Sequence, residues 1–257
     1  MPRTRFTILG SSAGLPQADR ATSGYLLTVG GRHLLVDCGG GICSSFRRRG
    51  FNPRDVDRII ISHTHPDHCC ELPLFLQMMY LMKRADPVDI YLPEEFVEPF
   101  RALQAAMYIP PEKLSFEPRL HGYGDGFTLD TDRFTLVAHA NNHLAHNTDL
   151  FDRLGWPNRG QSHSLVISVG EKHLLYSGDI KGFDDIRHLI DGCEYVITET
   201  THIDMDPFLT FAQHADVGRF IITHLADDDN VMQINAAFRK AGLDNFVCAV
   251  DGMELPL

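Results

Sequence analysis

The sequence predicts an α/β fold in which two β-sheets are covered by helices. Each half of the chain contains two apolar runs joined by glycine, a pattern typical of a β-hairpin. These paired runs are residues 25–29 with 33–36, and residues 164–169 with 173–176. Helix-like segments separate the remaining apolar runs, which favours sheets with helical cover. No linker rich in proline, glycine or serine divides the halves, so we expect a single domain over residues 1–257.

The other expected elements follow from hydrophobic patterning. The remaining strands are expected at residues 6–9, 58–61, 88–92, 134–138, 195–198, 220–223 and 246–250. Helices are expected from the glycine triplet 39–41 to about residue 49, from residue 66, and over 72–82, 94–107, 183–190 and 231–241. Residues 72–82 are apolar on most faces, so we expect that helix to be mostly buried.

Composition narrows the class of protein. The chain has 257 residues, of which 44% are hydrophobic and 22% charged, as in a globular protein. Its formal net charge is −11, whereas a protein that grips nucleic acid usually presents a basic face. The cluster Arg47-Arg48-Arg49 is interpreted as the solvated end of a helix. No apolar run reaches membrane-spanning length or resembles a signal peptide, so we expect a cytoplasmic protein.

The six cysteines show no CxxC pair and no zinc-ribbon spacing. Cys69 and Cys70 directly follow a cluster of histidines and could be mistaken for metal ligands. We interpret both as buried small apolar residues at the start of a helix.

The strongest signal is the segment Ser62-His63-Thr64-His65-Pro66-Asp67-His68, directly after the strand expected at 58–61. His63 and His65 alternate along an extended backbone and therefore point to one side. Asp67 and His68 then begin a helix. Each residue type has a structural alternative to metal binding: Asp67 alone could be a helix N-cap, and a single histidine could be a core residue. Three histidines and one aspartate within six residues favour a metal site instead, because zinc, manganese and iron all accept imidazole and carboxylate ligands.

Other expected ligands are isolated polar residues near the ends of three strands. His143 follows the strand at 134–138, Asp179 follows the strand at 173–176, and His224 follows the strand at 220–223. Their positions predict one cleft at one edge of the sheets. His139, His146 and His163 are rivals of His143 as the third histidine.

These motifs resemble the metal-binding series of the metallo-β-lactamase superfamily. Leu9-Gly10-Ser11, residues 35–39 and residues 251–254 further resemble its ribonuclease Z branch, and the likeness spans essentially the whole chain. The resemblance implies an αββα sandwich, with two mixed sheets packed face to face and helices on both outer faces. It also favours His143 over its rivals.

The resemblance further implies two divalent metal ions per chain, zinc in preference to manganese or iron. By that likeness His63, His65 and His143 hold one ion, Asp67, His68 and His224 hold the other, and Asp179 bridges them. A hydroxide bound to both ions would be the nucleophile, which makes Asp67 part of the catalytic machinery as well. The implied activity is metal-dependent hydrolysis.

The chain departs from ribonuclease Z in two respects. No Gly-rich basic arm for tRNA is found, and the expected Gly-His-Ser/Thr segment is missing. His202, after Glu199-Thr200-Thr201, is the stand-in we consider for that catalytic histidine, and His163 is a second candidate for proton donation or oxyanion binding, with a structural role as the alternative. A cyclic phosphodiesterase of carbon–phosphorus lyase pathways is a second relative, but its cysteine cluster for a structural zinc has no counterpart in residues 11–23.

Residues 144–161 form an insertion that we expect to be a loop or short helix over the metal cleft. Phe151, Trp156 and Arg159 are candidates for substrate contact. The alternative is an ordinary surface loop with a buried tryptophan.

The first functional hypothesis is hydrolysis of a phosphodiester in a small molecule or nucleotide. The alternatives are hydrolysis of a lactone, thioester or amide on the same fold, or tRNA 3′ processing as in ribonuclease Z. A metal-binding or redox module is a further class, disfavoured because His65 is intact and no second domain follows. We expect no stable binding of nucleic acid and no membrane association, with a homodimer as an open question.

Overall fold

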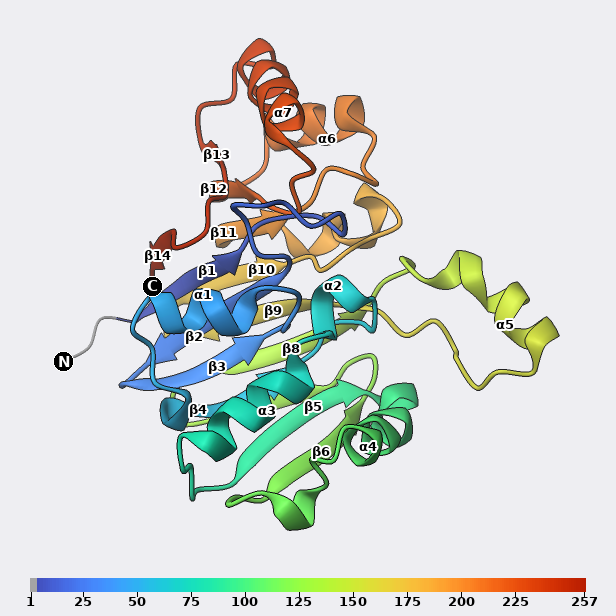
Figure 1. The fold of residues 1–257 in the computed structure, drawn as a ribbon. Coiled ribbons are helices and arrows are strands. Elements are labelled where there is room, and N and C mark those ends of the chain that lie inside the picture. Colours follow the sequence, from blue (N-terminus) through green and yellow to red (C-terminus); the bar gives the residue numbers. More distant parts are fainter. Residues whose placement is uncertain (1–3) are drawn as a thin grey trace. The chain divides into compact units, whose positions relative to one another are not determined.

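The chain divides into two compact units (Figure 1). The computed structural model describes residues 4–257; residues 1–3, which enter the expectation about a signal peptide, lie outside the described residues. Unit 1 comprises the chain up to Tyr123 together with Asp251–Leu257, and unit 2 comprises Gly124–Val250. Across residues 4–257, no helix is both long and apolar enough to cross a membrane.

Unit 1 is built on a mixed sheet. Its strands are β1 (Arg5–Gly10), β2 (Gly24–Val29), β3 (Arg32–Val36), β4 (Val56–Ile60), β5 (Val88–Pro93), β6 (Pro118–Tyr123) and β14 (Glu254–Pro256). Among the described residues they form a seven-stranded sheet in the order β14-β1-β2-β3-β4-β5-β6. The strands from β14 to β3 pair antiparallel, whereas β3 to β6 run parallel. The hairpin predicted around Gly30 and Gly31 is β2 and β3.

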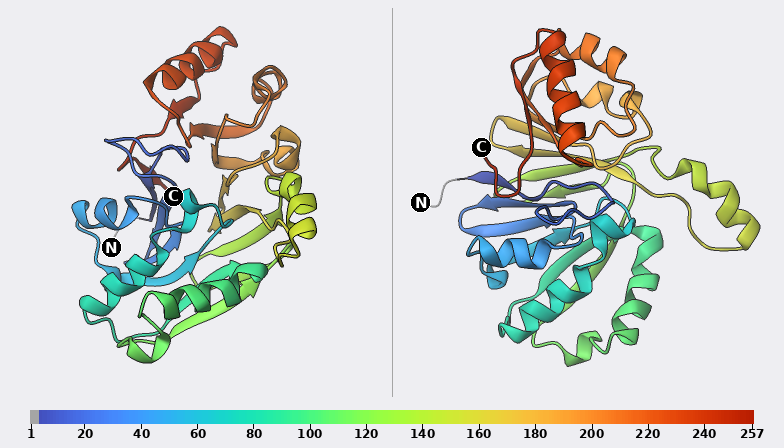
Figure 2. Two further views of the ribbon diagram at one scale, coloured as in Figure 1. Left: turned by 45° about the vertical axis from the view of Figure 1, so that its right-hand side comes forward. Right: turned by 45° about the horizontal axis from the view of Figure 1, so that its top comes forward.

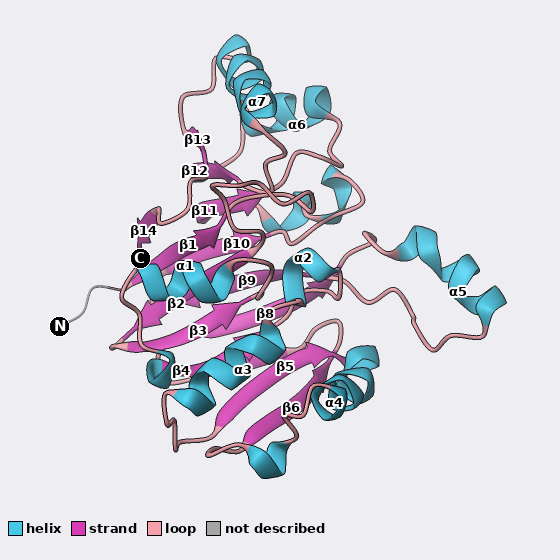
Figure 3. Ribbon diagram, viewed as in Figure 1, coloured by secondary structure: helices cyan, strands magenta, loops and turns pink. Residues whose placement is uncertain are grey.

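Helices cover the sheet of unit 1 (Figure 3). They are α1 (Ile42–Arg48), α2 (Pro66–Cys69), α3 (Leu72–Leu81) and α4 (Val97–Ala106), with short 3-10 helices η1 (Pro53–Asp55), η2 (Glu94–Phe96) and η3 (Pro111–Lys113). Phe46, Phe75 and Phe100, one from each of the longer helices, are buried in one core with the strands. Leu74 and Leu81 of α3 are 48% and 67% exposed. The prediction that this helix is buried on most faces is therefore wrong for its outer face.

Unit 2 is built on a second mixed sheet. Its strands are β7 (Thr128–Asp130), β8 (Thr135–Ala140), β9 (His163–Val169), β10 (Lys172–Tyr176), β11 (Cys193–Thr198), β12 (Val217–Ile222) and β13 (Phe246–Cys248). Within unit 2 they form a seven-stranded sheet in the order β13-β12-β11-β10-β9-β8-β7. The strands from β10 to β13 run parallel, and those from β7 to β10 pair antiparallel. The second predicted hairpin is β9 and β10.

The helices of unit 2 are η4 (Ala145–Asn147), α5 (Thr148–Leu154), η5 (Phe183–Asp185), η6 (Arg187–Leu189), α6 (Met205–Ala212) and α7 (Asp228–Lys240). Phe208 of α6 and Phe238 of α7 are buried with Phe220 of β12 in one core. The helix predicted over 183–190 is instead the two 3-10 helices η5 and η6. The Asp185 carboxylate accepts from the backbone N–H of Lys181, and such local bonds compete with a continuous helix.

The insertion at 144–161 contains η4 and α5, as predicted. α5 buries none of its residues and projects away from the strands of its own unit in Figure 1 and in the right-hand view of Figure 2. Trp156 is 55% exposed, and its ring meets the Phe151 ring edge-on with centroids 5.3 Å apart. The alternative of a loop with a buried tryptophan is therefore wrong.

The hairpin of unit 1 contains a buried histidine that should make stability depend on pH. His33 of β3 is 8% exposed, its Nδ1 lies 3.0 Å from Thr28 Oγ1, and its ring meets the edge of Phe51. Burial lowers the pKa of His33 to about 4, because the charged imidazolium loses its hydration. The folded state therefore binds this proton less readily than the unfolded chain, whose histidine titrates near 6.5.

We therefore expect the free energy of unfolding to include a contribution from neutral His33. This contribution is fully present above pH 6.5 and is lost as the pH falls towards 4. The loss should amount to about 3 kcal/mol over that interval. Urea unfolding of wild type and His33→Gln at pH 7 and pH 5 measures it, since the amide does not titrate and all other groups are shared. Equal pH dependence in the two proteins would contradict the assignment.

Candidate metal centre

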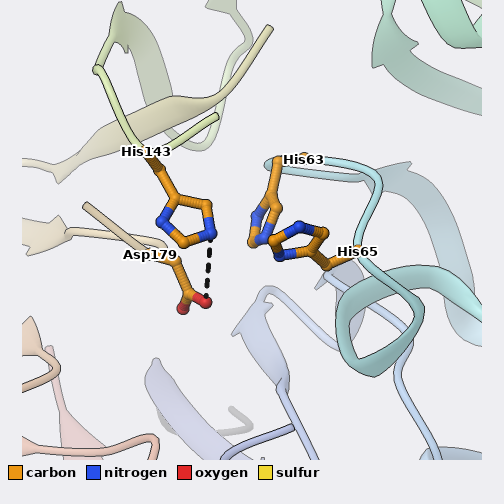
Figure 4. A group of neighbouring side chains, drawn as sticks. All are labelled: His63, His65, His143 and Asp179. Carbon is orange, nitrogen blue, oxygen red and sulfur yellow. Dashed lines mark ion pairs between the residues drawn. The ribbon is translucent and has the colours of Figure 1, made fainter. Parts of the chain in front are cut away.

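The motif of unit 1 lies where the sequence predicts it, between β4 and α2. His63 and His65 are in the extended segment after β4, and Pro66 begins α2. His63 is fully buried, and the two imidazole rings meet edge-on with centroids 4.9 Å apart (Figure 4). The alternation predicted from the HxH spacing thus places both rings together.

Asp67 and His68 lie in α2, one turn further along. The Asp67 Oδ2 atom is 3.5 Å from the His68 Nε2 atom, and the rings of His68 and His63 have centroids 4.1 Å apart. The four residues of the motif therefore form one cluster of imidazoles and a carboxylate in unit 1.

Asp37, directly after β3, orients His68. Its carboxylate is fully buried, and Oδ2 lies 2.8 Å from His68 Nδ1. The same carboxylate accepts from the Ser62 backbone N–H at 2.7 Å and from the Ser62 hydroxyl at 2.8 Å. Because a carboxylate only accepts, Nδ1 of His68 carries the proton, which leaves the Nε2 lone pair for a metal.

The backbone of α2 is held against the glycine-rich turn before α1. Thr22 Oγ1 donates to the Asp67 carbonyl at 2.8 Å, and the Ser23 N–H donates to the same oxygen at 3.1 Å. A Cβ atom on Gly39 would lie 1.8 Å from that carbonyl oxygen. Glycine at position 39 is therefore required for the close approach that positions Asp67 and His68.

In unit 2 one carboxylate meets two imidazoles. Asp179 lies in the turn after β10, His143 in the loop after β8 and His224 after β12. Asp179 Oδ2 is 3.7 Å from His143 Nε2, drawn as a dashed line in Figure 4, and 3.4 Å from His224 Nε2. All three residues are buried. The strand-end ligands predicted in the second half therefore come together.

The loop of His143 is fixed by its neighbours. The Asn141 side-chain oxygen accepts from the His143 N–H at 3.2 Å, and its amide donates to Ser164 Oγ at 3.1 Å. The His139 ring faces His188, and His146 is exposed, with its Nδ1 3.0 Å from the His143 carbonyl oxygen. Among the described residues, the groups able to hold a metal ion include His143 but none of its three rivals. Within unit 2 the geometry thus supports His143 as the ligand.

His224 adopts φ = 54°, in the left-handed region that side chains with a Cβ rarely occupy. Strained residues of this kind persist where surrounding structure over-determines them, often at functional sites. The conformation brings the imidazole towards Asp179 immediately after β12.

His202 is held beside His143 by a buried glutamate. Glu199 is fully buried; its Oε1 lies 2.7 Å from His202 Nδ1, and its Oε2 accepts from the His202 N–H at 3.0 Å. The rings of His202 and His143 have centroids 5.0 Å apart. The hydrogen bond to Glu199 raises the pKa of His202, since the carboxylate stabilises the imidazolium.

His163 opens β9 and is 1% exposed. Its backbone pairs with Ala140 in the neighbouring strand. Its part in proton donation stays a prediction.

The two cysteines after the motif differ from each other. Cys69 is buried, its Sγ lies 3.4 Å from the His65 carbonyl oxygen, and burial raises the pKa of its thiol to about 12, which disfavours the thiolate that a metal needs. Cys70 is exposed, so the prediction that both are buried is wrong for this residue. Its place at the C-terminal end of the short α2 turns it outward.

The donor sets of both units fit a metal such as zinc. Two ligands held about 2.0–2.1 Å from a tetrahedral ion lie roughly 3.3 Å apart. The pairs Asp67–His68, Asp179–His224 and Asp179–His143 are separated by 3.5, 3.4 and 3.7 Å, and these residues and His63 and His65 belong to groups able to hold a metal ion. Imidazole nitrogen and carboxylate oxygen are donor types that zinc, manganese and iron accept.

Sequence reasoning missed the residues that support the ligands, namely Asp37 and Glu199. Each is a single acidic residue at the end of an apolar strand, which is a weak signal by itself. An acidic residue at the end of a buried strand is expected to be paired when it is buried. Asp37 and Glu199 are both fully buried, so each needs a hydrogen-bond partner.

Comparison with known proteins identifies the family and the fold. The family model described as anti-Pycsar protein Apyc1 matches residues 4–217. A ribonuclease Z of Methanosarcina acetivorans is 36% identical, with 98% of both chains covered, and one of Methanothermobacter thermautotrophicus is 26% identical, with 86% of both covered. Among solved structures, the metallo-β-lactamase fold protein YhfI of Bacillus subtilis matches with a TM-score of 0.77 at 21% identity, and the short form of human tRNase Z with 0.74 at 20%; both matches cover 98% of each chain.

Two mixed sheets with helices, carrying clustered histidines and aspartates at their strand ends, define a metal-dependent hydrolase of the metallo-β-lactamase fold. The predicted fold class is confirmed. The chain belongs to the family of the anti-Pycsar protein Apyc1, within the ribonuclease Z-like branch of that superfamily.

Proposed function

We propose that the chain is a phosphodiesterase that acts on a small molecule or nucleotide. The main support for this proposal is the position of Asp179. Its buried carboxylate faces the imidazoles of both His143 and His224, which is the position expected of a ligand shared by two metal ions. The likeness to ribonuclease Z favours a phosphodiester bond, and the net charge of −11 favours a small substrate over a polyanion.

The proposed centre joins the ligands of both units into one catalytic domain. His63 and His65 would hold one ion with His143, Asp67 and His68 would hold the other with His224, and Asp179 would bridge them. Zinc is the proposed metal, and two such ions, when bound, would supply Lewis acidity for hydrolysis of the phosphodiester. Asp37 would keep His68 in the tautomer that can bind metal. His202, hydrogen-bonded to Glu199, would deliver a proton to the leaving group.

Metal content tests the centre directly. We expect about two divalent ions per chain after purification without chelator, and loss of hydrolysis after their removal. Elemental analysis of the protein and restoration of activity by zinc, manganese or iron provide the measurement. A fully active protein without bound metal would overturn the proposed centre.

A substrate panel tests the reaction. Bis-p-nitrophenyl phosphate and a cyclic nucleotide represent phosphodiesters, and a lactone and a thioester represent the other bonds that this fold hydrolyses. We expect turnover of the phosphodiesters. Silence on both of them, with turnover of the lactone or thioester by the metal-loaded protein, would overturn the proposal.

Processing of tRNA 3′ ends is the second candidate. Its support is the 36% identity to the Methanosarcina ribonuclease Z over nearly the whole of both chains. Precursor tRNA belongs in the same panel, and its cleavage at a rate above that of the small phosphodiesters would favour this candidate over the first.

A further inference from the structure

A cavity in unit 1 lies apart from the candidate metal ligands. It is lined by residues 16–22 of the loop between β1 and β2, by residues of α1 and the turn before it, and by Asp251. Its volume is about 750 Å³, within the range usual for sites of small organic ligands. Among the described residues, the lining includes none of the candidate metal ligands, so the cavity is a site of its own.

Arginines from two elements line this cavity. Arg48 and Arg49 lie at the C-terminal end of α1, and Arg20 lies in the loop before β2. Arg47, the first arginine of the triplet, is exposed and is not part of the lining; its Nη1 lies 3.5 Å from the Phe51 carbonyl oxygen. The basic cluster that the sequence favours as a solvated helix end is therefore divided, and two of its members contribute to the cavity.

The lining has an excess of positive charge, although the chain as a whole carries a net charge of −11. Its carboxylates are those of Asp19 and Asp251. Asp251 Oδ1 accepts from the Ser11 N–H at 3.0 Å and the Ser11 hydroxyl at 2.9 Å, and Oδ2 accepts from the Ala21 N–H at 2.8 Å. Both oxygens of Asp251 are thus engaged in fixing the loop, and Asp19 is exposed, where water screens its charge.

Hydrogen bonds hold Arg49 in place. Its Nη1 donates to the Ser45 carbonyl at 3.1 Å and to the Ser45 hydroxyl at 2.7 Å. A Cβ atom at Gly252 would lie 2.8 Å from Arg49 Nε and 2.9 Å from Nη2, so the guanidinium packs against this glycine. A side chain that is already fixed loses little conformational entropy when a ligand binds. Arg48, the preceding residue, is exposed and can be reached from solvent.

We propose that this cavity binds a small organic phosphate, separately from the phosphodiester that the metal centre would hydrolyse. Guanidinium groups match the geometry of phosphate oxygens, and their charge-assisted hydrogen bonds are stronger than neutral ones. A phosphate group presents three oxygens in different directions, so it can accept from arginines of α1 and of the loop together. The two oxygens of a carboxylate lie in one plane and suit a single guanidinium. The site does not depend on the proposed hydrolytic function.

Titration calorimetry with pyrophosphate as the probe tests the site. Pyrophosphate also binds metal ions, so the test uses metal-loaded protein and compares variants that share one metal centre. We expect Arg48→Gln to raise the Kd for pyrophosphate at least about fivefold, because it removes one charge-assisted hydrogen bond. Arg47→Gln is the matched control: it removes the same charge from the neighbouring exposed residue, outside the cavity, and should bind pyrophosphate as wild type does.

Two results would overturn the site. One is no binding of pyrophosphate by the wild-type protein, and the other is an equal Kd in Arg48→Gln and Arg47→Gln, which would place the bound anion at the metal ligands or on the general surface. Citrate tests the class of ligand: we expect it to bind at least about fivefold more weakly than pyrophosphate, and binding of equal strength would overturn the assignment to a phosphate. Melting temperatures of both variants identify any loss that reflects folding alone.

Discussion

Replacing Asp179 with asparagine is expected to lower kcat/KM for phosphodiesters by at least about 1000-fold. The buried carboxylate faces two imidazoles, at 3.7 Å from His143 and 3.4 Å from His224. An amide has the same shape but no charge, so its neutral oxygen would be a much weaker ligand for metal cations than the carboxylate. Metal ions contribute several kcal/mol of transition-state stabilisation, and each 1.36 kcal/mol corresponds to a tenfold change in rate.

The measurement is kcat/KM on bis-p-nitrophenyl phosphate together with metal content per chain. Asp244→Asn, an exposed carboxylate in the same unit, is the matched control and should leave both values unchanged. A folded Asp179→Asn protein that retained two metals and more than a tenth of the activity would remove Asp179 from the centre. A circular dichroism spectrum like that of wild type makes the comparison valid.

Elements with strong local signals were predictable. The two hairpins are marked by glycine between apolar runs, and the strands β4, β11 and β12 are apolar runs of a length that suits a buried strand. Two of the missed strands depend on partners distant in sequence. β6 reads Pro-Arg-Leu-His-Gly-Tyr, which contains no apolar run, and is a strand because it pairs along its whole length with β5. β14 is a three-residue edge that exists through its pairing with β1.

The helix α6 was missed for a different reason. Pro207 interrupts the pattern, yet proline is tolerated in the first turn of a helix, where its missing N–H has no partner to lose. Asp204 caps that turn by accepting a hydrogen bond from the Asp206 N–H. An aspartate can be recognised as an N-cap in the sequence only when the start of the helix is already known.

The candidate ligands were predictable because the same residue types recur at strand ends, where the chain must turn towards one edge of a sheet. Their supporting residues were not. Asp37 reaches Ser62 because Val36 of β3 pairs with Ile60 of β4, a register that no local pattern contains. The division of the ligands into a set in each unit likewise depends on topology rather than on spacing.

Asp37→Asn tests whether the buried carboxylate of Asp37 sets the tautomer of His68. The backbone at position 37 has φ = 58°, a conformation that asparagine tolerates well, so the change adds little strain. The Ser62 backbone N–H can only donate, so the amide must turn its oxygen towards that group. Its NH₂ group then faces His68 Nδ1, which must become an acceptor. The His68 proton moves to Nε2, and the nitrogen that should bind metal is blocked.

We therefore expect Asp37→Asn to weaken metal binding by about 10–100-fold, with a matching loss of hydrolysis at limiting metal. Asp57→Asn is the control, because it makes the same change at a carboxylate of β4 that accepts from Arg32 Nε at 2.8 Å, far along the strand from the motif. Zinc titrations monitored by activity and by calorimetry, with Tm recorded for each protein, compare the two. If Asp57→Asn weakened metal binding as much as Asp37→Asn, the loss at position 37 would reflect general destabilisation of unit 1. A large effect confined to Asp37→Asn would show that its carboxylate acts by holding one proton on one nitrogen of His68.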